Sequence, residues 1–171
     1  KYDLVTASYA LNEMSKDTRE KLLDKLLSAT KKLLLIVESG TTKAFSLQKE
    51  IRKYMADKGA ALIAPCPQNE TCPLPENDWC HFTCRVERSR LHKFLKDGDS
   101  PFEDEKFTYS AFCVDGSLSA CKARVLRHPL TEKGKITLTV CDGKSVSPVT
   151  LRKGDDGYKE AKKLGAGDSF D

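Results

Sequence analysis

Apolar residues in the first forty positions follow two spacings, which predict alternating strands and helices. Residues 3–7 form a short apolar run with a polar end, typical of a buried strand. Residues 33–37 are continuously apolar, which predicts a strand buried on both faces, as in parallel sheets. Between them, residues 16–29 are predicted to form an amphipathic helix that begins after the N-cap Ser15. Its apolar positions recur at helical spacing: Leu22, Leu23, Leu26 and Leu27.

The pattern over the remaining chain sets the expected fold class. Residues 45–58 predict a second helix ended by Gly59, and residues 83–96 predict a third. Strand–helix–strand–helix order is typical of an open α/β sheet of the doubly wound kind. Four further strands and a short helix are predicted at 107–114, 124–126, 136–141, 149–152 and 158–164. The second half is therefore expected to be mostly antiparallel, which gives a mixed sheet.

A loop at residues 64–82 is rich in both proline and cysteine. Proline fixes φ and removes a hydrogen-bond donor, so this segment is predicted to be neither a helix nor a central strand. Cys66, Cys72 and Cys80 lie within it, and the first two precede proline. A rigid loop with three thiols is well suited to holding sulfur atoms around one metal centre. Trp79, next to Cys80, is expected to shield that centre from solvent, with stacking on a base as the alternative.

The identity of the metal and of the fourth ligand stays open from spacing alone. A set of four cysteines suits a structural zinc ion or a cubane iron–sulfur cluster. Cys84 and His81 are the nearby rivals for the fourth position. Cys113 and Cys121 are interpreted as a core thiol and a loop thiol. Seven cysteines is an odd number, which favours reduced thiols and a metal site over a set of disulfides.

Charge permits nucleic-acid binding without requiring it. Basic first and last thirds flank an acidic middle third, within a net charge of +4. On the predicted third helix, four basic residues would share one face and could contact RNA phosphates, although a solvated helix face is the alternative: Arg85, Arg88, His92 and Lys96. A second candidate patch is Arg124, Arg127, Lys133 and Lys135.

The first predicted strand is followed by a candidate cleft edge. Ligands of doubly wound sheets bind at the carboxyl ends of the strands, so Ser8 and Tyr9 could line a cofactor cleft, and Asn12 and Glu13 are weak catalytic candidates. Ordinary loop residues are the alternative interpretation. The chain has no Gly-x-Gly-x-x-Gly or Gly-Lys-Ser/Thr phosphate motif. We therefore expect that a nucleotide-binding first strand would lie upstream, in a longer protein. The longest apolar run, residues 33–37, is far too short to span a bilayer, so no membrane partner is expected.

Across its whole length the chain resembles the methyltransferase-like protein 17 family. The matching segments are DLVTASYALNE at 3–13, VESGT at 37–41, APCP at 64–67, CPL at 72–74, DWCHF at 78–82, RVERS at 85–89, EDEKF at 103–107 and RVLRHP at 124–129. The cysteine loop with its Asp-Trp-Cys-His-Phe segment is the most specific of these.

The resemblance implies the C-terminal half of a class I, Rossmann-like methyltransferase fold, entered at its fourth strand. Within a single domain, residues 1–63 would end the Rossmann-like half, residues 64–100 would form the cysteine-rich insertion and basic helix, and residues 101–171 an antiparallel region with a final helix. The upstream half would carry the S-adenosylmethionine loop and contact this chain. The resemblance also implies a [4Fe–4S] cluster on Cys66, Cys72, Cys80 and Cys141.

By the same resemblance, the expected role is assembly of the mitochondrial small ribosomal subunit through binding of its rRNA and ribosomal proteins. The expected location is the mitochondrial matrix, or the bacterial cytoplasm for a bacterial relative. Two other hypotheses remain beside it. One is an active S-adenosylmethionine-dependent rRNA methyltransferase, and the other is a zinc-stapled RNA-binding module.

Overall fold

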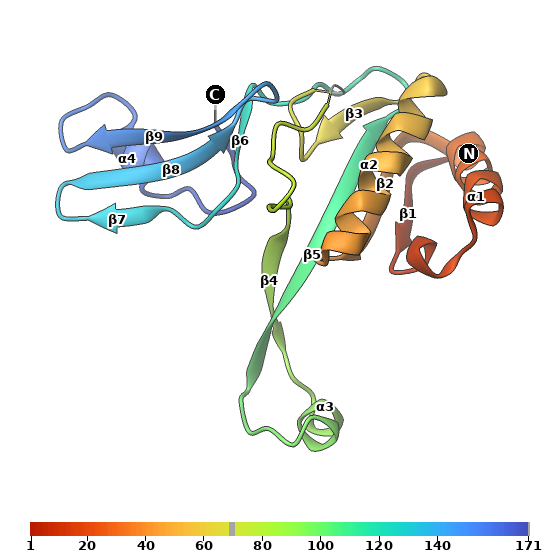
Figure 1. Cartoon of the computed structure of the whole chain (residues 1–171), viewed down its shortest axis with the longest axis horizontal. Helices are drawn as coiled ribbons and strands as arrows, with labels where there is room; N and C mark the ends of the chain where they lie inside the picture. The colour runs from red at the N-terminus through yellow and green to blue at the C-terminus, as the bar shows by residue number, and fades with distance from the viewer. Residues whose placement is uncertain (69–70, 171) are drawn as a thin grey trace.

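Two five-stranded sheets and two long helices dominate the part of the chain that the structure, a computed structural model, describes: residues 1–68 and 71–170 (Figure 1). The first sheet holds β1 (Tyr2–Ser8), β2 (Thr30–Ser39), β3 (Ala61–Ala64), β4 (Phe82–Glu87) and β5 (Phe102–Cys113). The second holds β6 (Ala123–Val125), β7 (Leu130–Glu132), β8 (Lys135–Cys141), β9 (Val146–Arg152) and β10 (Ser169–Phe170). The helices are α1 (Lys16–Ala29), α2 (Thr42–Asp57), α3 (Arg90–Leu95) and α4 (Tyr158–Ala161), with a 3₁₀ turn at Leu11–Glu13.

The first sheet is mixed, as the sequence predicts, with the order β1-β2-β5-β3. β1 and β2 run parallel and are joined by α1, whereas β5 lies antiparallel to β2 and β3. β5 is long because it serves two partners. Its second half, from Phe107, pairs with β2, and its first half pairs with β4.

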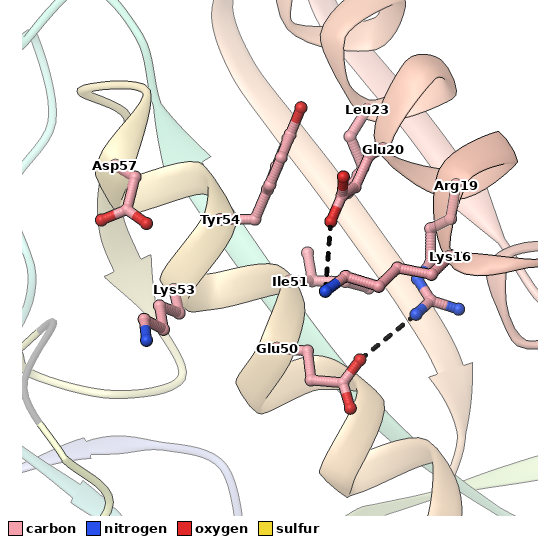
Figure 2. Close-up of a pocket in the computed structure, with 9 residues that line it drawn as sticks. All are labelled: Lys16, Arg19, Glu20, Leu23, Glu50, Ile51, Lys53, Tyr54 and Asp57. Atoms are coloured by element: carbon pink, nitrogen blue, oxygen red, sulfur yellow. Dashed lines mark hydrogen bonds and ion pairs between the residues drawn. The ribbon is translucent and has the colours of Figure 1, made fainter.

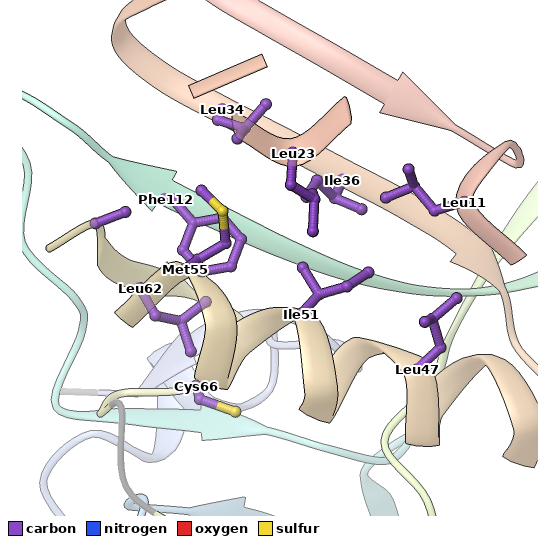
Figure 3. Close-up of a cluster of buried hydrophobic side chains, with 11 residues drawn as sticks. Leu11, Leu23, Leu34, Ile36, Leu47, Ile51, Met55, Leu62, Cys66 and Phe112 are labelled. Atoms are coloured by element: carbon purple, nitrogen blue, oxygen red, sulfur yellow. The ribbon is translucent and has the colours of Figure 1, made fainter. Parts of the chain in front are cut away.

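α1 and α2 cover one face of this sheet, and the main core lies beneath them (Figure 3). Leu23 of α1 and Ile51 and Met55 of α2 pack in one cluster with Leu34 and Phe112 of the sheet. The prediction that the strand at 33–37 is buried on both faces is therefore only half right. Leu34 and Ile36 are fully buried, but the alternate positions Leu33, Leu35 and Val37 are only half-buried, because both helices lie on the same side.

The first predicted helix has the predicted bounds, whereas the second, predicted at 45–58, begins three residues earlier, at Thr42, and ends at Asp57. The Ser15 side chain accepts a hydrogen bond from the backbone N–H of Thr18, which satisfies one of the free donors at the start of α1. Thr41 does the same for Ala44 at the start of α2. Gly59 follows the last turn of α2 with φ +82°, a left-handed conformation that glycine adopts without strain.

The predicted third helix at 83–96 is wrong over its first half. Residues from Phe82 to Glu87 form β4, which pairs with β5 from Phe107 to Phe102, and only the short α3 follows. β4 and the first half of β5 extend beyond the other strands of the first sheet and away from the second sheet, and α3 lies at their tip (Figure 1). We call this projection, residues 82–107, the arm.

The antiparallel strands of the second half form a sheet of their own rather than extending the first, with the exception of β5. Its order is β10-β6-β8-β7, and β9 pairs with the other edge of β8. A separate core lies beneath it, with Ile136 and Leu138 of β8 packed near Ala161 of α4. The predicted final helix at 158–164 is thus confirmed as the shorter α4.

A shallow groove of about 250 Å³ separates α1 from α2 on the helical layer (Figure 2). Its charged residues neutralise one another, since Arg19 pairs with Glu50 at 3.2 Å and Lys16 with Glu20 at 3.9 Å. Among the described residues that line it there is no cysteine. Within the described ranges, no helix has the length and apolar character needed to cross a bilayer.

Gly40 is expected to tolerate no side chain. A Cβ atom there would lie 2.6 Å from the Cβ of Lys106 and 2.8 Å from the backbone nitrogen of Phe107. Gly40→Ala should therefore lower the free energy of unfolding by about 1–3 kcal/mol, the usual cost of overpacking. Chemical denaturation measures this change. Gly165→Ala is the matched control, because its nearest contact would be an ordinary 3.8 Å; equal stability of the two variants would contradict the close approach at Gly40.

Candidate metal centre

The four cysteines predicted as metal ligands line one small cavity. Cys66, Cys72 and Cys80 come from the loop between β3 and β4, and Cys141 comes from the end of β8 in the other sheet. Positions 69 and 70 of this loop lie outside the described residues. The cavity lining is otherwise apolar apart from one guanidinium: Pro65, Pro67, Leu74, Arg124 and Leu126. The structure therefore brings together thiols from two distant parts of the chain.

An apolar and aromatic layer separates these thiols from solvent. Cys66, Cys80 and Cys141 are at most 9% exposed, and Cys72 is half-buried. Trp79 packs in the same cluster, and its indole N–H donates to the carbonyl oxygen of Gly40 at 2.9 Å. The Trp79 ring is thereby fixed over the cysteine loop, an arrangement that suits the predicted shielding role.

The rival fourth ligands do not line the cavity. Cys84 lies exposed on β4, and its sulfur is directed at the carbonyl oxygen of Arg85. His81 stacks on Trp79 with ring centroids 4.9 Å apart. Cys113 is a buried thiol of β5 whose sulfur donates to Asp115, which agrees with its interpretation as a core thiol. Cys121 is a half-buried residue between β5 and β6, where a loop thiol is expected.

Burial makes the cavity thiols weak acids. It raises the pKa of Cys66 to about 11 and that of Cys80 to about 12, and it also raises the pKa of Cys141. The neighbouring thiols add to each shift, since several thiolates would repel one another. Arg52 on α2 opposes the shift at Cys66 and Cys141 through its positive charge. Without a metal, Cys66, Cys80 and Cys141 are therefore protonated at neutral pH.

The donor set fits a metal group that prefers thiolate sulfur. All four side chains are cysteine, and no carboxylate or imidazole lines the cavity among the described residues. Zinc and iron–sulfur clusters are the usual partners of such a set. In the described part of the chain, no three His, Cys, Asp or Glu side chains are grouped as one bound metal ion requires.

Two arginines predicted as RNA contacts brace the cysteine loop instead of facing outward freely. The Arg124 guanidinium donates to the carbonyl oxygens of Pro65 at 2.8 Å and Gly167 at 2.9 Å. Arg127 pairs with Asp78 and donates to the carbonyl oxygen of Trp79. Both side chains therefore hold the second sheet against the loop, and their predicted role in RNA binding stays untested.

The predicted basic helix face does not exist as one face. Arg85 lies on β4 and pairs with Asp104 on β5, at 2.9 Å. Arg88 donates to Glu103 at 2.9 Å, and His92 and Lys96 approach the same carboxylate. All four side chains are thus engaged by carboxylates that the sequence places 7 to 19 residues farther along. Lys133 lies in the turn before β8, and Lys135, the first residue of β8, pairs with Glu132.

Sequence analysis missed a basic surface on α2. Lys49, Arg52 and Lys53 outnumber the one carboxylate, Asp57, in a hollow of about 390 Å³ that Thr71 and Cys72 of the cysteine loop also line. Lys49 and Lys53 are exposed, and within the described residues neither makes an ion pair. The spacing of these three cations along 49–53 is the signal that could have found them. Their spacing alone does not predict a groove, because its other wall is formed by the cysteine loop and not by α2.

The candidate cleft edge lies where the sequence places it. β1 ends at Ser8 and β2 at Ser39, with their carboxyl ends at the same edge of the sheet. Tyr9 has φ +55° and donates its N–H to the carbonyl oxygen of Val37, while the buried Glu38 accepts from the N–H of Leu11. Asn12 and Glu13 sit on the 3₁₀ turn held by this contact. Their catalytic and cofactor roles stay predictions.

The raised thiol pKa values predict that the metal-free protein loses stability in alkali. As pH rises above 9.0, the ordinary pKa of a cysteine thiol, the unfolded chain loses thiol protons that the folded chain retains. Stability should then fall by about 1.4 kcal/mol per pH unit for each such thiol. Urea denaturation between pH 7.5 and 10 measures this slope.

The Cys66→Ala/Cys80→Ala variant is the control for other groups that titrate in alkali. It should show a shallower loss of stability over the same range, because two of the raised thiols are absent. Parallel slopes for the variant and the unsubstituted protein would contradict the burial of these thiols.

Comparison with known proteins places this chain in a ribosomal family. The family described as mitochondrial small ribosomal subunit Rsm22 matches residues 1–171. Two fission yeast (Schizosaccharomyces pombe) proteins, the Rsm22-cox11 tandem proteins 1 and 2, mitochondrial, are each 23% identical to it over a 219-residue alignment. The alignment covers 99% of this chain and 29% of each relative, so the chain spans under a third of their length. The match over its full length shows that the chain belongs to the Rsm22 family.

Proposed function

We propose that this chain is the C-terminal part of a mitochondrial assembly factor that binds the rRNA of the small ribosomal subunit and whose binding surface is organised by a [4Fe–4S] cluster. The observation that carries the proposal is the single cavity lined by Cys66, Cys72, Cys80 and Cys141. Membership of the Rsm22 family supports a role linked to the mitochondrial small subunit, and the two relatives are themselves named mitochondrial. The matrix is the proposed compartment.

We favour a cubane cluster over zinc on the family resemblance, which implies a [4Fe–4S] cluster on these four cysteines. Both groups are held by four thiolates, and in a cubane each thiolate binds its own iron. When bound, the cluster would supply four metal–sulfur bonds that link the loop to β8. Its proposed role is structural, because metal binding contributes directly to the free energy of folding.

The chain's own residues would then position the RNA-binding surface. Ordering the cysteine loop fixes Thr71 and Cys72 beside α2 and so completes the groove that Lys49 and Lys53 line. Lysines at the rim of such a groove neutralise phosphates without reading the base sequence. The four basic residues predicted to contact RNA from the arm are less available, because Glu103 and Asp104 already engage them: Arg85, Arg88, His92 and Lys96. We therefore assign the phosphate contact to α2.

The exposed edge of β1 supports a further, upstream part of a methyltransferase-like domain. Within the described residues β1 pairs only with β2, and five of its seven residues are exposed. Tyr2 is 71% exposed and Leu4 53%, although parallel strands are usually covered. We propose that strands of the upstream half pair with β1, which would also place an S-adenosylmethionine site near Ser8 and Tyr9. Methyl transfer with Asn12 and Glu13 near the acceptor remains the alternative function.

Metal analysis of the full-length protein, purified without oxygen, tests the cluster. We expect about four irons and four sulfides per chain, with visible absorption, and their loss in Cys141→Ser. Cys113→Ser is the matched control, because Cys113 is equally buried but belongs to β5 outside the cavity. One zinc without sulfide would establish the zinc-stapled alternative, and an unchanged iron content in Cys141→Ser would exclude Cys141 as a ligand.

Charge reversal on α2 tests the RNA surface. Lys49→Glu/Lys53→Glu in the full-length protein should weaken binding to small-subunit rRNA and flatten its dependence on salt. Loss of two phosphate contacts lowers the slope of log affinity against log salt by about two, which filter binding between 50 and 200 mM salt resolves. Lys21→Glu/Lys25→Glu is the matched control, with the same spacing and exposure on α1. If both double variants weakened binding equally, the effect would come from the overall charge of the protein and not from a phosphate contact on α2.

A further inference from the structure

The tip of the arm presents an apolar surface to solvent. α3 joins β4 to β5 at the end farthest from both sheets (Figure 1). Leu91, Phe94 and Leu95 lie at i, i+3 and i+4 on this helix, which places them on one face. They are 66%, 82% and 72% exposed. Large apolar side chains grouped on a projecting element are typical of interaction sites.

The helix is held with its polar side inward, the reverse of an ordinary surface helix. His92 and Lys96, on the opposite face, both approach the carboxylate of Glu103 on β5. Arg88, just before the helix, donates to the same carboxylate at 2.9 Å, and both partners are largely buried. Ser89 caps the helix by accepting from the N–H of His92. These contacts fix the orientation of α3, so the outward apolar face is set by the fold.

The distribution of charge at the tip favours a protein partner over RNA. The carboxylate of Glu103 already engages three of the basic groups, which makes them poor phosphate ligands. Beside the apolar face lies the exposed Arg90, four residues before Phe94, whereas Lys93 is half-buried on the other side of the helix. The outward face of α3 is therefore mainly apolar, which suits an apolar groove on a protein. Amphipathic helices bind proteins in this way through anchors at i, i+3 and i+4.

We propose that the arm docks Leu91, Phe94 and Leu95 into an apolar groove on a protein of the small ribosomal subunit. The choice of that subunit rests on the proposed function, whereas the docking surface rests on α3 alone. The arm would give the protein a second contact, separate from the phosphate contact on α2. Two tethered contacts bind more tightly than either alone, because the second forms within the same complex.

Site-specific photo-cross-linking tests the occupant of this face. Phe94 is replaced by p-benzoylphenylalanine in the full-length protein, which is irradiated with purified mitochondrial small subunits. We expect a cross-link to a subunit protein that survives nuclease and is lost on protease treatment. The same photo-reactive residue at Leu130, a 68% exposed position on β7, is the control and should not give that product. A product with rRNA, with a second copy or with phosphatidylcholine–cardiolipin vesicles, or no product, would overturn the proposal.

Co-sedimentation with the small subunit measures the contribution of the face. Phe94→Ser/Leu95→Ser should weaken binding by at least about 30-fold, as expected when central apolar anchors of an interface are lost. Leu118→Ser/Leu130→Ser is the control with two exposed leucines elsewhere. Both double variants should melt like the parent, since the changed side chains are exposed. Unchanged binding of the Phe94→Ser/Leu95→Ser variant would also overturn the proposal.

Binding to protein-free rRNA separates this proposal from the proposed function. The Phe94→Ser/Leu95→Ser variant should bind naked rRNA as the parent does, because α2 is untouched. If the parent itself fails to bind naked rRNA, the proposed function fails while the cross-link at position 94 still reports on the arm.

Discussion

The fold depends on one buried contact between the cysteine loop, which has little regular structure, and the end of β8. Most residues between β3 and β4 have no ladder of backbone hydrogen bonds to position them. Side chains do so instead: Arg124 holds Pro65, and Trp79 donates to Gly40 at the turn before α2. The four thiols lie at the centre of these contacts. Because the loop joins two sheets with separate cores, any group that binds all four sulfurs fixes the sheets relative to each other.

The sequence could predict the local part of this centre but not its long-range part. Proline and cysteine spacing in residues 64–82 exclude a helix and leave metal binding as the natural use of three thiols. No spacing argument reaches Cys141, which lies on a strand of the other sheet; the family resemblance alone pointed to it. The choice among Cys84, His81 and Cys141 follows from the pleat of β4 and from stacking on Trp79, neither of which local sequence encodes.

The error at 83–96 has the same physical origin. Arg85, Arg88, His92 and Lys96 recur at helical spacing, yet their partners Glu103 and Asp104 lie on the returning strand. Cross-strand ion pairs stabilise a hairpin in a way that a helical pattern cannot reveal. The helices at 16–29 and 45–58 were predictable because each buries its own apolar face against the sheet. α3 buries no residue, so apolar periodicity carried no information about its surroundings.

The number of cations in a sequence is larger than the number that can bind an anion in the folded protein. An arginine that already donates to a carboxylate must leave that partner before it can bind a phosphate, and the arm holds most of its basic groups in this state. On α2 the opposite holds: Arg52 faces the thiols, whereas Lys49, about one turn earlier, and Lys53, the next residue, are exposed. The groove that these lysines line is closed on its other side by Thr71 and Cys72. A ligand that orders the four sulfurs would therefore also shape the basic groove, which couples the metal centre to the surface proposed for RNA.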